Sequence, residues 1–168
     1  MRQLKIHTTQ DDHRVAKLAA LAIGLHLIEA VVPSPLPGVK PGIANIVTLY
    51  VLYRFDFATA AWVSLLRVFA SSLLFGNFLS PTFVLSLSGA MMSLVALYFA
   101  QYLPRRHFGP VSLSIFAAFA HMLAQLLLVR FWLIPHAGVA YLIPIFMLAA
   151  LFFGLINGVV TSILLKRA

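Results

Sequence analysis

The chain has no cysteine, and only 4 of its 168 residues are acidic. The lack of cysteine excludes disulfides and thiolate chemistry. Charged residues make up 10% of the sequence, whereas soluble domains have about 25%. So few charges cannot cover a soluble surface. Asp11 and Asp12 are the only adjacent acids, which disfavours enzymes that hold a metal between two aspartate-rich motifs.

Apolar residues dominate instead, at 62% of the sequence, with a mean hydropathy of +0.99. They fall into six segments, at 15–32, 42–53, 55–75, 82–103, 111–130 and 139–165. A helix that crosses a membrane needs about 20 residues, so the second segment is either a half-helix or is lengthened by the proline-rich stretch before it. We predict an all-α integral membrane protein with six transmembrane helices, and a kink at Pro144. Residues 1–14 form a cytoplasmic tail, and residues 15–168 form a single membrane domain.

The net charge is +8, which in a soluble protein would suggest nucleic acid as a partner. Here the basic residues stand at the ends of apolar segments, so contact with membrane lipid is expected and nucleic acid is not. With the N-terminus inside, the cytoplasmic segments hold Arg2, Lys5, Arg14, Lys17, Arg54, Arg105, Arg106, Lys166 and Arg167. The outer segments hold Lys40 and Arg130. This bias predicts that both termini lie in the cytoplasm, beneath the inner (cytoplasmic) membrane.

One stretch, residues 29–48, combines features that do not belong together in a membrane helix. It has an acid, Glu29, inside an apolar segment, and then four prolines and Lys40 before the next apolar segment begins. Proline at this density ends a helix. Non-helical backbone within a membrane survives only where protein or water surrounds it. The stretch is therefore predicted to form a wall or gate of a polar site.

Two charges lie within predicted spans, Glu29 in the first and Arg67 in the third. At about 1.5 Å per residue, they lie roughly 21 Å and 18 Å from the cytoplasmic side. Charges inside a membrane are costly unless they are paired, so we predict a Glu29–Arg67 ion pair. Two interpretations stay open at this point: the pair only holds the helices together, or Arg67 also faces a ligand.

Further polar residues fall at similar depth or nearer the outer face. His121 and Gln125 are four residues apart and so share one helix face, where they bridge helices or bind a ligand. No second histidine or carboxylate has ligand spacing, so no metal and no cofactor are predicted. The other candidate substrate-binding residues are Asn45, Thr48, Ser71, Ser86 and Ser88. The serines of the fourth span are also typical of close helix packing. Together these residues predict a polar cavity that opens outward.

Small residues four apart mark two helix faces. Ala16 and Ala20 lie in the first span, and Gly154 and Gly158 lie in the sixth. Such faces let another helix approach closely. Packing inside the bundle and docking of a partner subunit both remain open.

Several of these motifs together resemble one family. They are Glu29, Pro33, the Pro-Gly-x-Lys-x-Gly-x-Ala-Asn-Ile-Val-Thr-Leu run at 37–49, Leu66-Arg67-Val68, Gly76, Ser86-Leu-Ser-Gly89, and His121-x-x-x-Gln125. The chain resembles the Gx transporter family, whose members are often labelled heptaprenyl diphosphate synthase component I. Pro41 departs from the pattern, because a small or aliphatic residue is expected before the glycine.

The resemblance implies more than the residues alone do. The family is similar to the substrate-binding (S) components of energy-coupling factor transporters. Those have six membrane helices and an outer pocket gated by the first loop. An Ala-x-x-x-Ala stripe docks a transmembrane coupling subunit driven by two ATPases, and Ala16 and Ala20 occupy the equivalent place. The chain has no G-x-x-x-x-G-K-[ST] motif, so energy for transport has to come from partners unless the chain acts as a facilitator.

These observations lead to one functional prediction and two alternatives. The prediction is a transport subunit that captures a small, anionic or vitamin-like molecule, with Lys40 and Arg67 suited to an anion. The first alternative is an accessory membrane component of polyprenyl diphosphate metabolism, not an enzyme by itself. The second is a structural subunit of a membrane complex, in which the polar residues serve helix packing alone.

Overall fold

The computed structural model describes residues 9–31, 41–104 and 108–167. This part of the chain contains six α-helices and no strand. The helices are α1 (Gln10–Val31), α2 (Ala44–Arg54), α3 (Phe57–Leu74), α4 (Pro81–Ala100), α5 (Pro110–Leu128) and α6 (Ile143–Arg167). A π-helical turn, η1 (Val129–Leu133), and a 3-10 segment, η2 (Ala137–Leu142), connect α5 to α6. The prediction of an all-helical chain is confirmed.

Helix boundaries follow local signals in the sequence. Asp56 caps α3 by accepting hydrogen bonds from the N–H and the hydroxyl of Thr59, both at 2.8 Å. Ser80 caps α4, and Pro81 and Pro110 occupy first-turn positions, where a missing N–H costs nothing. Pro144, where a kink of the sixth span is predicted, is the second residue of α6, where the 3-10 segment gives way to the α-helix.

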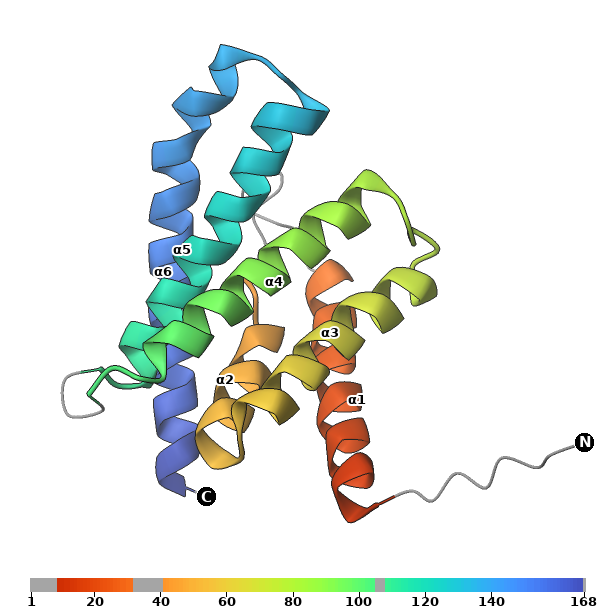
Figure 1. The fold of residues 1–168 in the computed structure, drawn as a ribbon, viewed down its shortest axis with the longest axis vertical. Helices are drawn as coiled ribbons and strands as arrows, with labels where there is room; N and C mark the ends of the chain where they lie inside the picture. The colour runs from red at the N-terminus through yellow and green to blue at the C-terminus, as the bar shows by residue number, and fades with distance from the viewer. Residues whose placement is uncertain (1–8, 32–40, 105–107, 168) are drawn as a thin grey trace, which may run out of the picture.

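The helices alternate in direction, and the first residue of α1 and the end of α6 lie at the same end of the bundle (Figure 1). We call this the terminal end and the opposite one the far end. The helices α1 and α6 run along the long axis, α5 is inclined to it, and α3 and α4 cross it more obliquely (Figure 1). Helix α5 packs against both α4 and α6, and α1 packs against α3. With 11 residues, α2 is about 17 Å long and cannot cross a membrane, in agreement with the half-helix interpretation.

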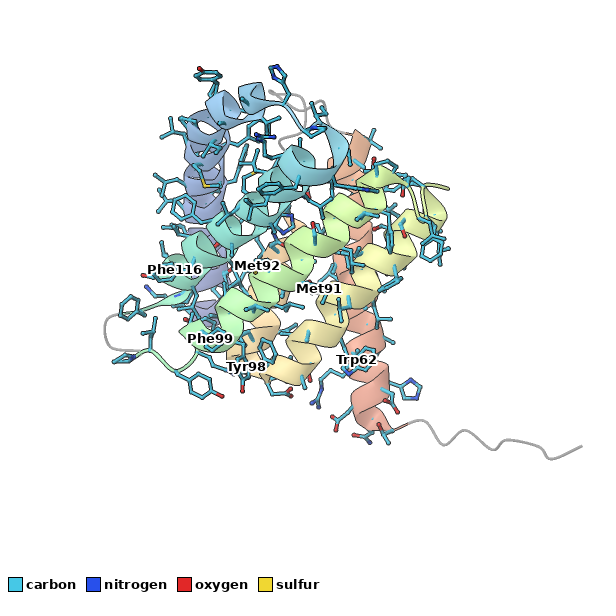
Figure 2. All side chains as sticks on the ribbon, turned by 45° about the horizontal axis from the view of Figure 1, so that its top comes forward. Trp62, Met91, Met92, Tyr98, Phe99 and Phe116 are labelled. Carbon is cyan, nitrogen blue, oxygen red and sulfur yellow. The ribbon has the colours of Figure 1, made fainter. Side chains whose placement is uncertain are left out.

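Four helical stretches are long and apolar enough to cross a membrane: 57–74, 81–100, 110–133 and 137–167. These stretches indicate a multi-pass membrane protein. The outer surface agrees, because it exposes large apolar side chains that lipid can cover. Figure 2 labels six of them on α3, α4 and α5: Trp62, Met91, Met92, Tyr98, Phe99 and Phe116.

The apolar core lies towards the terminal end. It consists of buried small and aliphatic residues of α1 to α5, namely Ala22, Val47, Leu49, Val51, Leu52, Ala60, Val63, Leu97, Ala100, Leu113 and Ala117. We call this set the apolar plug. The far half has smaller apolar clusters, also buries polar side chains such as Glu29, Arg67, Ser71 and Ser72, and surrounds a cavity.

Candidate functional site: a cavity in the far half of the bundle

A cavity of about 420 Å³ lies among α1, α3, α4, α5, α6 and the start of α2. Its size is within the range of small-molecule sites, which runs from about 300 to 1,000 Å³. Its lining includes the predicted residues Asn45, Arg67, Ser71, Ser86, His121 and Gln125. The structure therefore brings together polar residues that are up to 80 positions apart in the sequence, from Asn45 to Gln125.

The backbone of Pro41 and Gly42 forms one corner of this cavity. The N–H of Gly42 donates a hydrogen bond to Glu29 Oε1 of α1. The side-chain amide of Asn157 on α6 donates to the carbonyls of Pro41 and Gly42, at 3.0 and 3.2 Å. Two helices that are remote in sequence are thereby joined through one short segment, which we call the Gly42 corner.

Gly42 suits this position because its φ is +70°, a backbone conformation that other L-residues rarely adopt. A Cβ at this position would also lie 3.1 Å from Asn45 Nδ2. The carbonyl of Gly42 accepts a further hydrogen bond, at 2.8 Å, from the N–H of Asn45 as α2 begins. Gly42, the residue that follows Pro41, therefore sets where α2 starts.

Arg67 and Glu29 are both almost fully buried, at 5% and 3% exposed, and both line the cavity. Their charges interact electrostatically, as predicted from their matching depth. They do not form a direct ion pair, because the described residues include no Arg67–Glu29 contact within 4.0 Å. Arg67 Nε and Glu29 Oε2 are buried and have no hydrogen-bond partner. The two charges thus interact without a direct contact, and each side chain keeps one buried atom without a partner.

His121 and Gln125 share the cavity-facing side of α5, as their spacing predicts. Gln125 Nε2 donates to the Leu85 carbonyl of α4 at 3.2 Å, so this side chain also bridges two helices. The ring of His121 lies against Gly89 of α4, where a Cβ would come within 2.5 Å of Nε2. Its Nδ1 is buried without a partner. Gly89 therefore makes the room that His121 occupies beside the cavity.

The remaining predicted residues are placed as follows. Ser71 lines the cavity, but its hydroxyl donates to the Arg67 carbonyl at 2.6 Å. Ser88 is not among the lining residues, because its hydroxyl turns back to the Leu85 carbonyl at 2.9 Å. Thr48 is buried below the lining residues, and its Oγ1 has no partner. Lys40 and the predicted first-loop gate lie outside the described residues. Among the described residues there is no group of three metal-ligating side chains.

The two small-residue faces differ in the structure. The face of Gly154 and Gly158 packs inside the bundle, since a Cβ at Gly158 would lie 2.5 Å from Val111 Cα of α5. Internal packing is thus the correct interpretation for α6. Ala16 and Ala20 of α1 are exposed, so their role as a docking face stays a prediction.

Asn157 is the main site residue that the sequence pattern does not single out. The pattern also does not show that α6 contributes to the site. Asn157 stands in a strongly apolar helix, one residue before Gly158. A lone amide inside a predicted span is the available signal, because buried polar groups in membranes almost always have partners. His26, Asn77 and Thr82 also line the cavity.

The model of one protein family, heptaprenyl diphosphate synthase component I, matches residues 18–164. The chain belongs to this family. The match covers α2 to α5 completely and most of α1 and α6, so the cavity lies within the region that defines the family. No curated protein and no solved structure matches the chain. The resemblance to the family that the sequence motifs indicate is confirmed.

Proposed function

We propose that this member of the heptaprenyl diphosphate synthase component I family is a membrane substrate-binding or transport subunit. It captures a small, anionic or vitamin-like molecule in the cavity at the far half of the bundle, which we place towards the outside of the inner membrane. The observation that carries the proposal is the cavity itself. All six helices contribute buried or half-buried polar side chains to one cavity, and a purely structural bundle has no need for such a space.

Several residues have defined roles in this proposal. Arg67, Asn45, Ser86 and His121 contact the ligand, while Glu29 and Asn157 hold the Gly42 corner that closes the site. Lys40 and Thr48 remain predicted contacts. Energy comes from a transmembrane coupling subunit with ATPases, and the exposed face of Ala16 and Ala20 is the proposed docking surface for that subunit.

The test is ligand binding to the full chain in lipid nanodiscs, with a panel of carboxylates, phosphates and vitamin-like compounds read out by thermal shift. Arg67→Met is expected to weaken binding of the strongest ligand by at least about tenfold, the equivalent of about 1.4 kcal/mol. Arg130→Met is the matched control, because Arg130 does not line the cavity. Equal affinity of wild type and Arg67→Met would remove Arg67 from the site.

The family description favours a second candidate, an accessory role in polyprenyl diphosphate synthesis. The adjacent acids Asp11 and Asp12 have other partners, and Asp11 Oδ1 accepts a hydrogen bond from Arg14 at 3.2 Å. Asp12 caps α1 by accepting hydrogen bonds at 2.8 Å from the N–H and hydroxyl of Thr9. The same two bonds, the backbone one first, hold the pKa of Asp12 below its usual value. Magnesium-dependent prenyl transfer by the purified chain would overturn the view that it is not itself an enzyme.

A further inference from the structure

The two buried charges in the cavity leave one donor and one acceptor without a partner. Glu29 Oε1 accepts the N–H of Gly42, whereas Oε2 has no partner. Arg67 Nε, a donor, is equally unpartnered. A buried charge whose hydrogen-bonding capacity is not satisfied is costly, and the cost is greatest inside a membrane. Both side chains line the cavity, so a ligand group that brings an acceptor to the Arg67 guanidinium and a donor to the Glu29 carboxylate would pair with both charges.

The polar side chains of the cavity come from all six helices, but much of its lining is apolar. Phe75 and Val129 follow Arg67 and His121 by eight residues, which is about 12 Å along a helix. Phe146 precedes Asn157 by eleven residues on α6, which is about 16 Å along that helix.

Part of the lining is apolar and consists of Phe75, Val129, Val139, Leu142 and Phe146. Polar residues such as Gln125, Asn77 and Thr82 also contribute to the lining. A molecule that pairs with Arg67 and Glu29 at one end can place the rest of its length against the apolar part.

We propose that the ligand is an amphiphile whose head pairs an acceptor with a donor, such as an amide, a ureido group or an α-amino acid. This rests on the proposed function and narrows its ligand class. The acceptor pairs with the Arg67 guanidinium, the donor pairs with the Glu29 carboxylate, and an apolar tail runs along the apolar part of the lining, towards Phe146. A plain carboxylate has nothing to donate to Glu29 and repels it, and a plain ammonium group repels Arg67.

The test uses four probes with one octyl-length chain: octanamide, octanoate, octylamine and octan-1-ol. Binding to the full chain is measured at pH 7 in phosphatidylglycerol nanodiscs. Octanamide is expected to bind at least about tenfold more tightly than octanoate or octylamine, since each of those satisfies one charge and opposes the other. Acetamide, which has the same head and no chain, is expected to bind at least about tenfold more weakly than octanamide.

Two variants test the head group separately from folding, because the readout is the ratio of two affinities on one folded protein. Glu29→Gln removes the negative charge and is expected to shift the preference from octanamide towards octanoate. Arg67→Met is expected to shift it towards octylamine. Arg130→Met is the control and leaves the ratios unchanged. If Glu29→Gln does not fold, Arg67→Met alone still decides the question.

The outcomes separate this inference from the proposed function. If octanoate or acetamide binds as tightly as octanamide, the proposal that the ligand is such an amphiphile is wrong. The cavity would still be a small-molecule site. If no probe binds but another compound of the panel does, the amphiphile is again overturned. If nothing binds, the proposed function fails as well.

Membrane lipid is a second source of the same chemistry, because phosphatidylethanolamine carries an ammonium donor, phosphate acceptors and apolar chains. The octanamide measurement is therefore repeated in nanodiscs of that lipid. Weaker octanamide binding there supports the amphiphile with lipid as its source, and unchanged binding supports a free solute.

Discussion

The two halves of the bundle differ in how they fill the space between their helices. In the terminal half, the apolar plug closes the interior with side chains such as Leu49, Val63 and Leu97, each 1% exposed or less. In the far half, the same helices diverge around a cavity of about 420 Å³. The oblique course of α3 and α4 (Figure 1) contributes to this, because inclined helices separate with distance from the point where they are closest. One half supplies stability, and the other half supplies the space that a ligand needs.

The largest expected effect tests whether the plug holds the bundle together. Leu97→Ala leaves a hole in a filled region and is expected to cost about 2–5 kcal/mol of stability. Leu126→Ala is the matched control. Leu126 is 6% exposed but lines the cavity, so its removal enlarges a space that already exists and costs less. Thermal unfolding of both variants in nanodiscs measures this. A larger loss for Leu126→Ala would contradict the comparison.

The next prediction concerns the tight contact between Gly158 of α6 and Val111 of α5. Gly158→Ala puts a methyl group 2.5 Å from the backbone of Val111, so the helices must separate, at about 1–3 kcal/mol. Gly24→Ala on α1 meets nothing within 4 Å and is expected to be neutral or slightly stabilising, because alanine favours a helix. Equal melting temperatures for the two variants would show that α5 and α6 are not in close contact.

A similar or smaller effect is expected at the Gly42 corner. Asn157→Ala removes the side-chain amide that donates to the carbonyls of Pro41 and Gly42. The Pro41 carbonyl then lacks this partner, and the variant is expected to lose about 1–3 kcal/mol of stability. Asn77→Ala is the control, since Asn77 also lines the cavity but has no side-chain hydrogen bond within the part of the chain described. Stability and binding of the strongest ligand are measured together. A variant that is as stable as wild type and binds as tightly would remove the corner from the site.

The smallest effect lies outside the cavity, at the cap of α3. Hydrogen bonds from Thr59, the backbone one first, hold the pKa of Asp56 below its usual value. The stabilisation is thus complete above the unfolded pKa of about 3.9 and is lost as the pH falls through the folded pKa. Asp56→Ala is expected to cost about 1 kcal/mol at pH 7, and the difference from wild type should shrink below about pH 4. A difference that stays constant from pH 7 to pH 3 would argue against the ionised cap.

Much of this comparison is visible in the sequence, and the reason is physical. Long apolar runs with proline, glycine and capping residues at their ends locate α3, α4 and α5 within a few residues. The polar residues of the far half are detectable because charged and polar groups are costly inside a membrane. Glu29, Arg67 and His121 stand out from their apolar segments on this ground alone.

Other features depend on contacts between distant residues and so escape a reading of local pattern. Asn157 carries no periodic signal, and its partners at Pro41 and Gly42 are more than 110 residues away. The spacing of Gly154 and Gly158 indicates a close neighbour without saying which helix it is. Glu29 and Arg67 match in depth, but depth does not determine whether two side chains touch, and these two face the cavity without direct contact.

The tight packing of Gly89 on His121 and of Gly158 on α5 has a consequence for motion. Contacts that leave no room for a methyl group do not slide easily, so α4, α5 and α6 are expected to move as one rigid body. Helices α1 and α3 form the other, linked to the first through the α3–α4 connection, the Gly42 corner and α2. The cavity lies along the seam between these bodies, with Arg67 on one side and His121 on the other. Any change in its volume is therefore expected to follow a hinge motion across that seam, and the hydrogen bonds of Asn157 to the Gly42 corner are expected to limit how far the hinge opens.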